Sequence, residues 1–450
     1  MKKGNAKALI PILVFIVLYL GLGITFEYGL KIPMGFYNIP IIGTFLIALL
    51  VACFQNKKLS FDDKLEVMGK GVGDKNIITM ILIFLVAGMF VGVLGRSSAE
   101  SVAYFMLSLI PANYAVAILF IVSCLVSLAM GTSVGTITLL TPIAVAVSGA
   151  SGFGIPICVA SVIGGSMFGD NLSFISDTTI AACNGQGCKM KDKFKANFNI
   201  ALPASLISLG VILALTVTHD CSGIVINDYN LIQIIPYLLV LILGVVGLNV
   251  FIVLIIGILS GTAVMLLTST VTFYELLTNI GSGISGMFET TMVAILVAAI
   301  CSLIDEYGGF QALLNFIKKV FKGKRRAQFG IGLLVALLDV ATANNTVAIV
   351  MANPIAKDIS KEFDIDKRRT ASLLDTFSCI VQGMLPYGAQ ILVAIAAVTE
   401  LGGELSAFSI LPYLVYPYAL LVFVIINIVF FSKKKKSTRK KKTKNEKVEA

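Results

Sequence analysis

The sequence predicts an all-α polytopic membrane protein made of two inverted-topology repeats, each with five membrane spans and one helical hairpin. Three observations carry this prediction: apolar runs recur along the whole chain, basic residues gather in alternate loops, and the two halves match at a constant offset. Hydrophobic residues make up 57% of the 450 residues and charged residues only 13%, about half the charged share that is usual in soluble proteins. This composition excludes a water-soluble protein and leaves no stretch for a soluble catalytic domain.

Ten apolar stretches are candidate membrane spans, because a helix needs roughly 20 mostly apolar residues to cross the hydrocarbon core. They cover residues 8–26, 39–55, 77–95, 155–182, 197–217, 231–247, 249–268, 289–304, 371–398 and 410–431. Two further segments, 114–149 and 327–356, are apolar but are interrupted by small polar residues and a proline. Such interruptions predict helical hairpins with unwound tips.

Basic residues set the predicted orientation, because loops rich in lysine and arginine stay in the cytoplasm. Both termini are therefore expected on the cytoplasmic side of the cell membrane, with the N-terminal span retained rather than cleaved. The basic loops expected on that side are 55–75, 188–195, 316–326 and 357–369. Ten of the 35 basic residues lie in 433–450, which is predicted to be a disordered tail beside anionic lipid and not a nucleic-acid-binding region. The eight scattered cysteines predict neither a disulfide framework nor a metal centre.

The two halves of the chain match at an offset of 212 residues. This offset aligns the Pro-Ile-Ala triplets that begin at Pro142 and Pro354, and it aligns Asp170 with Gln382. Because each half contains an odd number of crossings, the second half must be inverted relative to the first. Inverted repeats with broken helices are the architecture of secondary transporters. The chain accordingly divides into a first inverted repeat at 1–217, a second at 218–432 and the tail at 433–450.

Ionisable groups inside apolar spans are costly, so each one is a candidate for function. The stretch GDNLSFISDTT at 169–179 places two carboxylates, an amide and several hydroxyls between apolar segments. Asp170 and Asp177 would share a face of a continuous helix, whereas a helix break near Asp170 would free backbone carbonyls for coordination. Each aspartate can also be explained as the cap of a helix end. Hard oxygen ligands suit Na+ or a proton, so we predict Asp170 and Asp177 as Na+ ligands.

The hairpin tips and the second broken span supply further candidates. Small polar tip residues expose carbonyls and helix N-termini toward an ion or a carboxylate, although they also simply permit close helix packing. Asp375 mirrors the first acidic cluster, with a salt bridge to Arg368 or Arg369 as the alternative, and Asp339 is a further candidate. The predicted ion- or substrate-binding residues are Thr132, Ser133, Asp170, Asn171, Ser173, Asp177, Thr178, Asn344, Asn345, Thr346, Asp375 and Ser378.

Four motifs stand out along the chain: GTSVGT at 131–136, GDNLSFISDTT at 169–179, ANNTVAI at 343–349 and LLDTFSCIVQGMLPYGA at 373–389. In these motifs the chain resembles the NhaC-type Na+/H+ antiporter family of the broader ion-transporter superfamily. The resemblance implies ion-coupled secondary transport. It also implies site roles for Thr132, Ser133, Asp170, Ser173, Asp177, Thr178 and Asn345.

The chain departs from the family pattern at the expected site. Val134, Asn171 and Phe174 stand where a tryptophan, a basic residue and a proline are common, and Leu374-Asp375 replaces a frequent acidic pair. These differences leave the substrate open, because some relatives move amino acids or hydroxycarboxylates together with an ion or in exchange for one.

We expect a secondary active transporter that exchanges Na+ for protons by alternating access, with both ions competing for the same carboxylates. The alternative is an ion-coupled transporter of an amino acid or hydroxycarboxylate, bound by Asn171 and the hairpin tips. An enzyme is disfavoured because the chain has no HExxH motif and no nucleophile beside a base, although Asp170 and Asp177 formally permit an intramembrane aspartyl site. No cofactor is expected beyond the ions Na+ and H+, and oligomerisation stays open.

Overall fold

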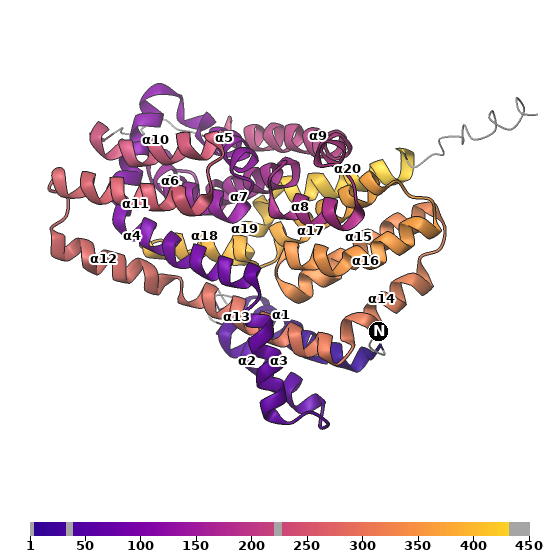
Figure 1. Ribbon diagram of the computed structural model, residues 1–450. Helices are drawn as coiled ribbons and strands as arrows, with labels where there is room; N and C mark the ends of the chain where they lie inside the picture. The colour runs from indigo at the N-terminus through magenta and orange to yellow at the C-terminus, as the bar shows by residue number, and fades with distance from the viewer. Residues whose placement is uncertain (1–3, 33–38, 220–226, 432–450) are drawn as a thin grey trace, which may run out of the picture.

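The computed structural model describes residues 4–32, 39–219 and 227–431, and the regular structure in these ranges is entirely helical (Figure 1). The basic tail predicted at 433–450 lies outside the described residues. Within the described ranges, nine helical segments are long and apolar enough to cross a membrane. The count becomes ten when the bent pair Ala407–Tyr413 and Val415–Phe430 is taken as one span. The chain therefore has the architecture of a multi-pass membrane protein.

The N-terminal part contains four helices: α1 (Ile10–Ile24), α2 (Ile41–Gln55), α3 (Phe61–Val72) and α4 (Lys75–Leu109). α1 packs against α2 through the stacked rings of Phe15 and Phe45, whose centroids lie 3.8 Å apart. α4 has 35 residues, and at about 1.5 Å per residue it would be longer than the hydrocarbon core is thick. Gly95 interrupts α4 with φ 57° and ψ −163°, a conformation that favours glycine.

The first predicted hairpin segment folds as α5 (Ala115–Met130) and α6 (Ser133–Ser151), joined by a tip at Gly131 and Thr132. The span predicted at 155–182 is broken into two helices, and a long helix follows it. These three helices are α7 (Ile155–Leu172), α8 (Asp177–Gln186) and α9 (Met190–Thr216). α7 packs closely along α5, so closely that a β-carbon on Gly169 would lie 2.4 Å from the backbone nitrogen of Leu128.

The second half begins with five helices: α10 (Leu231–Val246), α11 (Val250–Leu267), α12 (Phe273–Gly286), α13 (Phe288–Glu306) and α14 (Gly309–Val320). The second predicted hairpin follows as α15 (Lys324–Thr342) and α16 (Asn345–Glu362), with its tip at Ala343 and Asn344. The span predicted at 371–398 is again broken. The remaining helices are α17 (Lys367–Met384), α18 (Ala389–Glu400), α19 (Ala407–Ile410) and α20 (Val415–Phe431). Short helical turns occupy Ala6–Leu9, Thr25–Gly29, Ala112–Tyr114 and Leu411–Tyr413.

Three amphipathic helices, α3, α12 and α14, lie between the predicted spans. α3 and α12 each begin with a capping box, formed by Ser60 with Asp63 and by Thr272 with Glu275. α3 packs against α13, and α12 packs along α4. The predicted loop at 55–75 is therefore partly helical, because a capping box followed by an apolar stripe starts a helix even where the segment is too polar to span a membrane.

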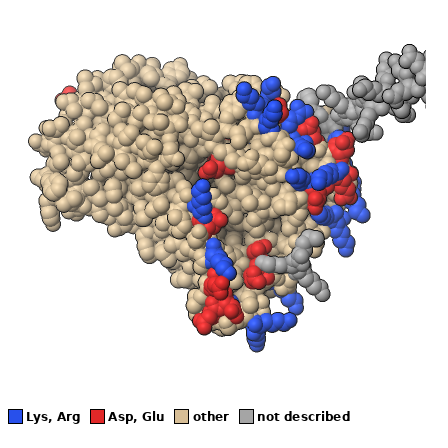
Figure 2. Space-filling view, viewed as in Figure 1, with Lys and Arg blue, Asp and Glu red and all other residues tan. Residues whose placement is uncertain are grey.

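Charged side chains gather toward one end of the molecule and on its underside in the view of Figure 2, where most of the remaining surface is uncharged. Two exposed ion pairs join the end of α14 and the start of α15 to the region at the end of α16, and a third lies within the start of α17. They are Lys318 with Asp358, Lys324 with Asp364, and Arg368 with Asp366. These residues belong to the basic loops 316–326 and 357–369. Their grouping is what the predicted orientation requires, because it places both loops on one side.

The centre of the bundle contains α6, α7 and α17, each of which buries most of its side chains. α17 is polar as well as buried, and its buried residues include Asp375, Thr376, Ser378 and Gln382. A polar helix inside a membrane protein is costly unless its groups bind one another or a ligand. α17 therefore marks the region in which to look for a site.

Candidate functional site

The break between α7 and α8, at residues 173–176, lies inside the bundle. The last carbonyls of a helix need partners other than its own amides, and a membrane interior offers little water to supply them. Side chains fill this need here. Ser176 Oγ donates to the Asp170 carbonyl at 3.0 Å, and Thr179 Oγ1 donates to the Ser173 carbonyl at 2.9 Å. The break near Asp170 is therefore a stably built feature and not a fraying helix end.

Asp170, in the last turn of α7, is only 4% exposed. Its Oδ2 accepts a hydrogen bond from Ser133 Oγ at 2.8 Å, and its Oδ1 accepts a longer one from Thr178 Oγ1 at 3.4 Å. Within the described part of the chain, no lysine or arginine forms an ion pair with this carboxylate. Hydroxyls from the first hairpin tip and from α8 therefore hold Asp170, and a counter-charge is missing.

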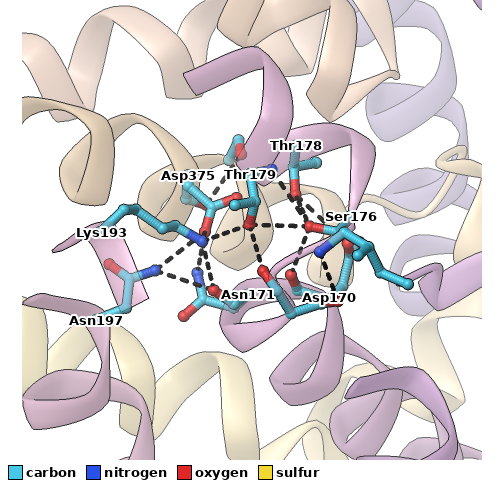
Figure 3. Close-up of polar contacts among 11 residues, drawn as sticks. Asp170, Asn171, Ser176, Thr178, Thr179, Lys193, Asn197 and Asp375 are labelled. Atoms are coloured by element: carbon cyan, nitrogen blue, oxygen red, sulfur yellow. Dashed lines mark hydrogen bonds and ion pairs between the residues drawn. The ribbon is translucent and has the colours of Figure 1, made fainter. Parts of the chain in front are cut away.

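Asp375, on α17, has a buried basic partner. Lys193 Nζ lies 2.6 Å from Asp375 Oδ2 and also donates to the Asn171 carbonyl at 2.6 Å and to Thr179 Oγ1 at 2.7 Å. Asn171 Nδ2 and Asn197 Nδ2 donate to the same Asp375 oxygen at 2.9 and 3.1 Å. Figure 3 shows the side chains of Lys193 and Asn197 pointing toward Asp375 and Asn171. All three ammonium protons are used, whereas Asp375 Oδ1 is buried without a partner among the described residues.

Sequence reasoning missed Lys193, which was placed in a cytoplasmic loop at 188–195. That segment begins α9, and the helix turns Lys193 and Asn197 into the bundle while Lys191 and Lys195 stay exposed. The signal was available: residues four apart lie on the same face of a helix, and Asn197 already lay in a predicted span.

The alternative partner proposed for Asp375 is also wrong. Arg368 Nη2 lies 2.7 Å from Asp366 Oδ2 at the exposed start of α17, and Arg369 Nε donates to Gln328 Oε1 at 2.9 Å. Asp375 lies two helical turns further along α17, deep in the bundle, and it pairs with Lys193. Asp375 therefore pairs with a residue of another helix and not with an arginine of its own helix.

The two hairpin tips follow the same backbone course. Gly131 and Ala343 are left-handed, with φ of 68° and 47°, and each precedes an extended N-cap residue, Thr132 or Asn344. The 212-residue offset relates these two pairs. The left-handed conformation costs a non-glycine residue such as Ala343 about 1 kcal/mol, and such strain concentrates at functional sites.

A chain of hydrogen bonds joins the two tips. Gln390 Nε2 donates to Ser133 Oγ at 3.1 Å, and Gln382 Nε2 donates to Gln390 Oε1 at 2.6 Å. Gln382 Nε2 also lies 3.1 Å from the carbonyl of Ala343. Because Ser133 in turn donates to Asp170, the chain runs from this carboxylate to the second tip. Gln390 was not among the predicted site residues, since it follows the break between α17 and α18.

The remaining predicted residues have more local contacts. Ser378 Oγ donates to the Asp375 carbonyl one turn earlier in α17, at 3.0 Å. Asn345 Oδ1 accepts from the Thr346 amide at 3.0 Å, and its buried Nδ2 has no partner among the described residues. Asp177 is exposed as the first residue of α8, where a helix N-terminus favours a carboxylate. Its role as a Na+ ligand stays a prediction.

A cavity of about 650 Å³ reaches the second tip, where Thr342 and Val347 line it. Asp74, Asp305 and Glu306 contribute carboxylates to its lining. A gap of about 10 Å³ beside Asn344 and Tyr387 shares Thr342 with this cavity, and a third void of about 300 Å³ shares Thr290 with the gap. The three voids therefore form an interrupted series past the second tip.

The chain is similar to several known proteins over most of its length. The chain is 22% identical over 448 residues to the malate-2H(+)/Na(+)-lactate antiporter of Bacillus subtilis, which covers 92% of this chain and 93% of that protein. It is also 22% identical over 356 residues to the Na(+)/H(+) antiporter NhaC of the same organism, covering 71% of this chain and 78% of that one. The solved YdaH transporter of Alcanivorax borkumensis is similar with a TM-score of 0.45 at 13% identity, covering 94% of this chain and 98% of that chain.

A family-level match spans nearly the whole sequence. The profile of the Na+/H+ antiporter family matches twice, at residues 7–216 and 224–433. The resemblance to the NhaC-type family is thereby confirmed, and so are the predictions of membrane transport and of a protein that is not an enzyme. The chain is a member of the Na+/H+ antiporter family.

Proposed function

We propose that the chain exchanges Na+ for protons by alternating access, with Asp170 as the carboxylate that binds either ion. The observation that carries this proposal is a charge balance. Asp170, Asp375 and Lys193 are all buried, and Asn171 links the two carboxylate positions. When all three groups are ionised they carry one net negative charge, which is costly in a low-dielectric interior. One monovalent cation on Asp170 restores neutrality, so Na+ and a proton compete for one place.

The surroundings of Asp170 favour this exchange. Ser133 Oγ and Thr178 Oγ1 already face the carboxylate, and both are hard oxygen ligands of the kind that Na+ prefers. The lone pairs of these oxygens coordinate a bound Na+, whereas a protonated carboxyl group donates a hydrogen bond to one of them. The same shell thus serves both ions without rearranging the helices.

The hairpin tips provide a route for alternating access. The first tip packs on the break beside Asp170, since a β-carbon on Gly131 would lie 3.0 Å from the Ser176 nitrogen. The second tip is tied to Asp170 through Gln390 and borders the large cavity. A movement of either tip therefore changes the exposure of Asp170 to one side. We place both termini in the cytoplasm of a cell-membrane protein, in agreement with the grouped charges of Figure 2.

Proteoliposomes that contain the purified chain test the proposal. Na+-driven proton flux should fall to background in Asp170→Asn, because asparagine keeps the shape but binds neither ion. Ser133→Ala should keep exchange while weakening the apparent Na+ affinity about tenfold, the cost of one hydrogen bond to a charged group. Asp358→Asn, at an exposed ion pair, is the matched control and should transport normally. In the wild type, apparent Na+ affinity should weaken steadily as pH falls. Normal flux in Asp170→Asn would overturn the proposal.

A second candidate function is exchange coupled to a small organic acid. Two observations favour it: the cavity of about 650 Å³ lies within the range of about 300–1,000 Å³ that small-molecule pockets show, and Asn345 Nδ2 is a buried donor without a described partner. The B. subtilis malate/lactate relative points the same way. Na+ binding with and without a panel of hydroxy acids and amino acids decides between the two. A solute that raises Na+ affinity about fivefold or more, reciprocally, would establish solute coupling.

A further inference from the structure

Asp339 is a second buried carboxylate that forms no ion pair with any residue the structure describes. It lies on α15, one turn before the second tip, and is fully buried. Neither of its carboxylate oxygens accepts a hydrogen bond from a side chain among the described residues, and the backbone of Gln382 is the polar group that faces it. An ionised group in this position pays the full cost of desolvation unless a cation joins it. An ionised Asp339 therefore requires a cation that the described residues do not provide.

Gln382, on α17, also has a buried oxygen without a partner among the described residues. Gln382 Nε2 is engaged with the Ala343 carbonyl and with Gln390, but Gln382 Oε1 is buried without a partner. α15 packs along α17, and the backbone of Gln382 lies beside the Asp339 carboxyl group. The Asp339 carboxyl group and Gln382 Oε1 thus leave three buried oxygens without a side-chain partner among the described residues. All three are acceptors, so the missing partner is a cation or a hydrogen-bond donor, and a cation also offsets the charge of an ionised Asp339.

The internal offset explains why these two residues meet. It pairs Gln382 with Asp170 and Asp339 with Ser127. In the first half the hairpin arm packs on the broken helix where Ser127 meets Gly169, directly before Asp170. Each half therefore has one carboxylate where its hairpin arm meets its broken helix. The first half carries it on the broken helix and the second half carries it on the hairpin arm.

We propose that Asp339 and Gln382 form a second cation-binding position, which takes a desolvated Na+. The inference rests on the proposed exchange of Na+, and it makes that exchange a process with two ion positions, one in each half. The path from the large cavity to this position is short, because Leu338 and Thr342, on either side of Asp339 in α15, both line that cavity. The lining of that cavity carries three carboxylates and the ammonium group of Lys70, and this net negative charge attracts cations toward this point.

Equilibrium binding of radiolabelled Na+ to the purified chain tests this proposal. The wild type should bind two Na+ per chain, and Asp339→Asn should bind one. Asp170→Asn should also bind one, and the double variant should bind none. Asp358→Asn, the exposed control, should bind two. A wild type that binds a single Na+ would overturn the second position, as would an Asp339→Asn protein that binds as many Na+ as the wild type.

A further variant separates binding from folding. Asp339→Ser installs the residue that the first half carries at the equivalent place, so it should remain folded by size-exclusion chromatography and still lose one Na+. The proposed function fails differently: a wild type with no Na+-driven proton flux overturns the exchange itself. Flux in the wild type together with one bound Na+ overturns only the second position.

Discussion

Replacing Lys193 by methionine tests whether the buried ion pair with Asp375 holds the two halves together. Methionine keeps the unbranched apolar stem and removes the ammonium group. Asp375 Oδ2 would then keep only the amides of Asn171 and Asn197 as partners. An unpaired carboxylate would be left at a position with no exposure to solvent. We therefore expect a folded but strongly destabilised protein.

The size of the effect follows from the contacts. Lys193 Nζ has three acceptors at 2.6 to 2.7 Å, and removal of one member of a buried pair costs about 3–5 kcal/mol. Asp375→Asn alone should cost a similar amount, because it leaves the ammonium group unpaired. The double variant leaves only neutral groups without partners, each at a cost of about 1 kcal/mol. The coupling free energy between the two positions should therefore be about 3 kcal/mol or more.

Equilibrium denaturation of the purified protein in mixed micelles, followed by far-ultraviolet circular dichroism, measures these free energies; the chain has no tryptophan to serve as an intrinsic reporter. Lys195→Met is the matched control, since Lys195 lies on the exposed face of the same helix. It should change stability by less than about 0.5 kcal/mol. If the losses of the two single variants add up to that of the double variant within about 0.5 kcal/mol, the two residues are not coupled and the reasoning is refuted.

Two further predictions concern the first hairpin tip and the start of α17. Gly131→Ala should impair exchange more than Gly187→Ala: both glycines have φ near 67°, but a β-carbon on Gly131 would lie within 3.0 Å of the break after α7, whereas nothing lies within 4 Å of one on Gly187. Equal losses of flux in the two variants would contradict a role for the tip. Hydrogen bonds from the Arg368 side chain hold the pKa of the Asp366 carboxyl group below its usual value. A depressed folded-state pKa adds stability above the unfolded value of about 3.9 and loses it as pH falls through the folded value. The difference in thermal midpoint between the wild type and Asp366→Asn should therefore stay constant from about pH 5 to 8 and shrink below about pH 4.

Much of the fold could be predicted because its signals are local. Apolar runs mark the long helices, and small polar interruptions mark the tips at Gly131 and Ala343. The break after Asp170 was likewise visible, since glycines and hydroxyls crowd the segment around it. The amphipathic helices were missed because a hydropathy threshold ignores capping boxes such as the one at Ser60.

The candidate site was only partly predictable. Asp170, Ser133 and Thr178 do lie together, as a dense polar motif inside a span implies. Lys193 was missed because the lysines around it occupy a basic segment, and the direction that one of them faces depends on how α9 packs. Gln390 was missed because it follows a helix break and resembles an ordinary polar residue near a span end.

The sequence by itself determined that this chain resides in a membrane, where its helices run and which acidic residues lie inside them. Those properties depend on the free energy of transferring short segments from water into lipid. The residues of each segment set this free energy without help from the rest of the chain. Only the tertiary structure decided which carboxylate is neutralised. The packing of α9 and α7 on α17 pairs Lys193 with Asp375, whereas Asp170 and Asp339 have no basic partner in the described part of the chain. In a low-dielectric interior a charge interacts strongly only with groups a few ångströms away, and those neighbours come from helices that are distant in the sequence.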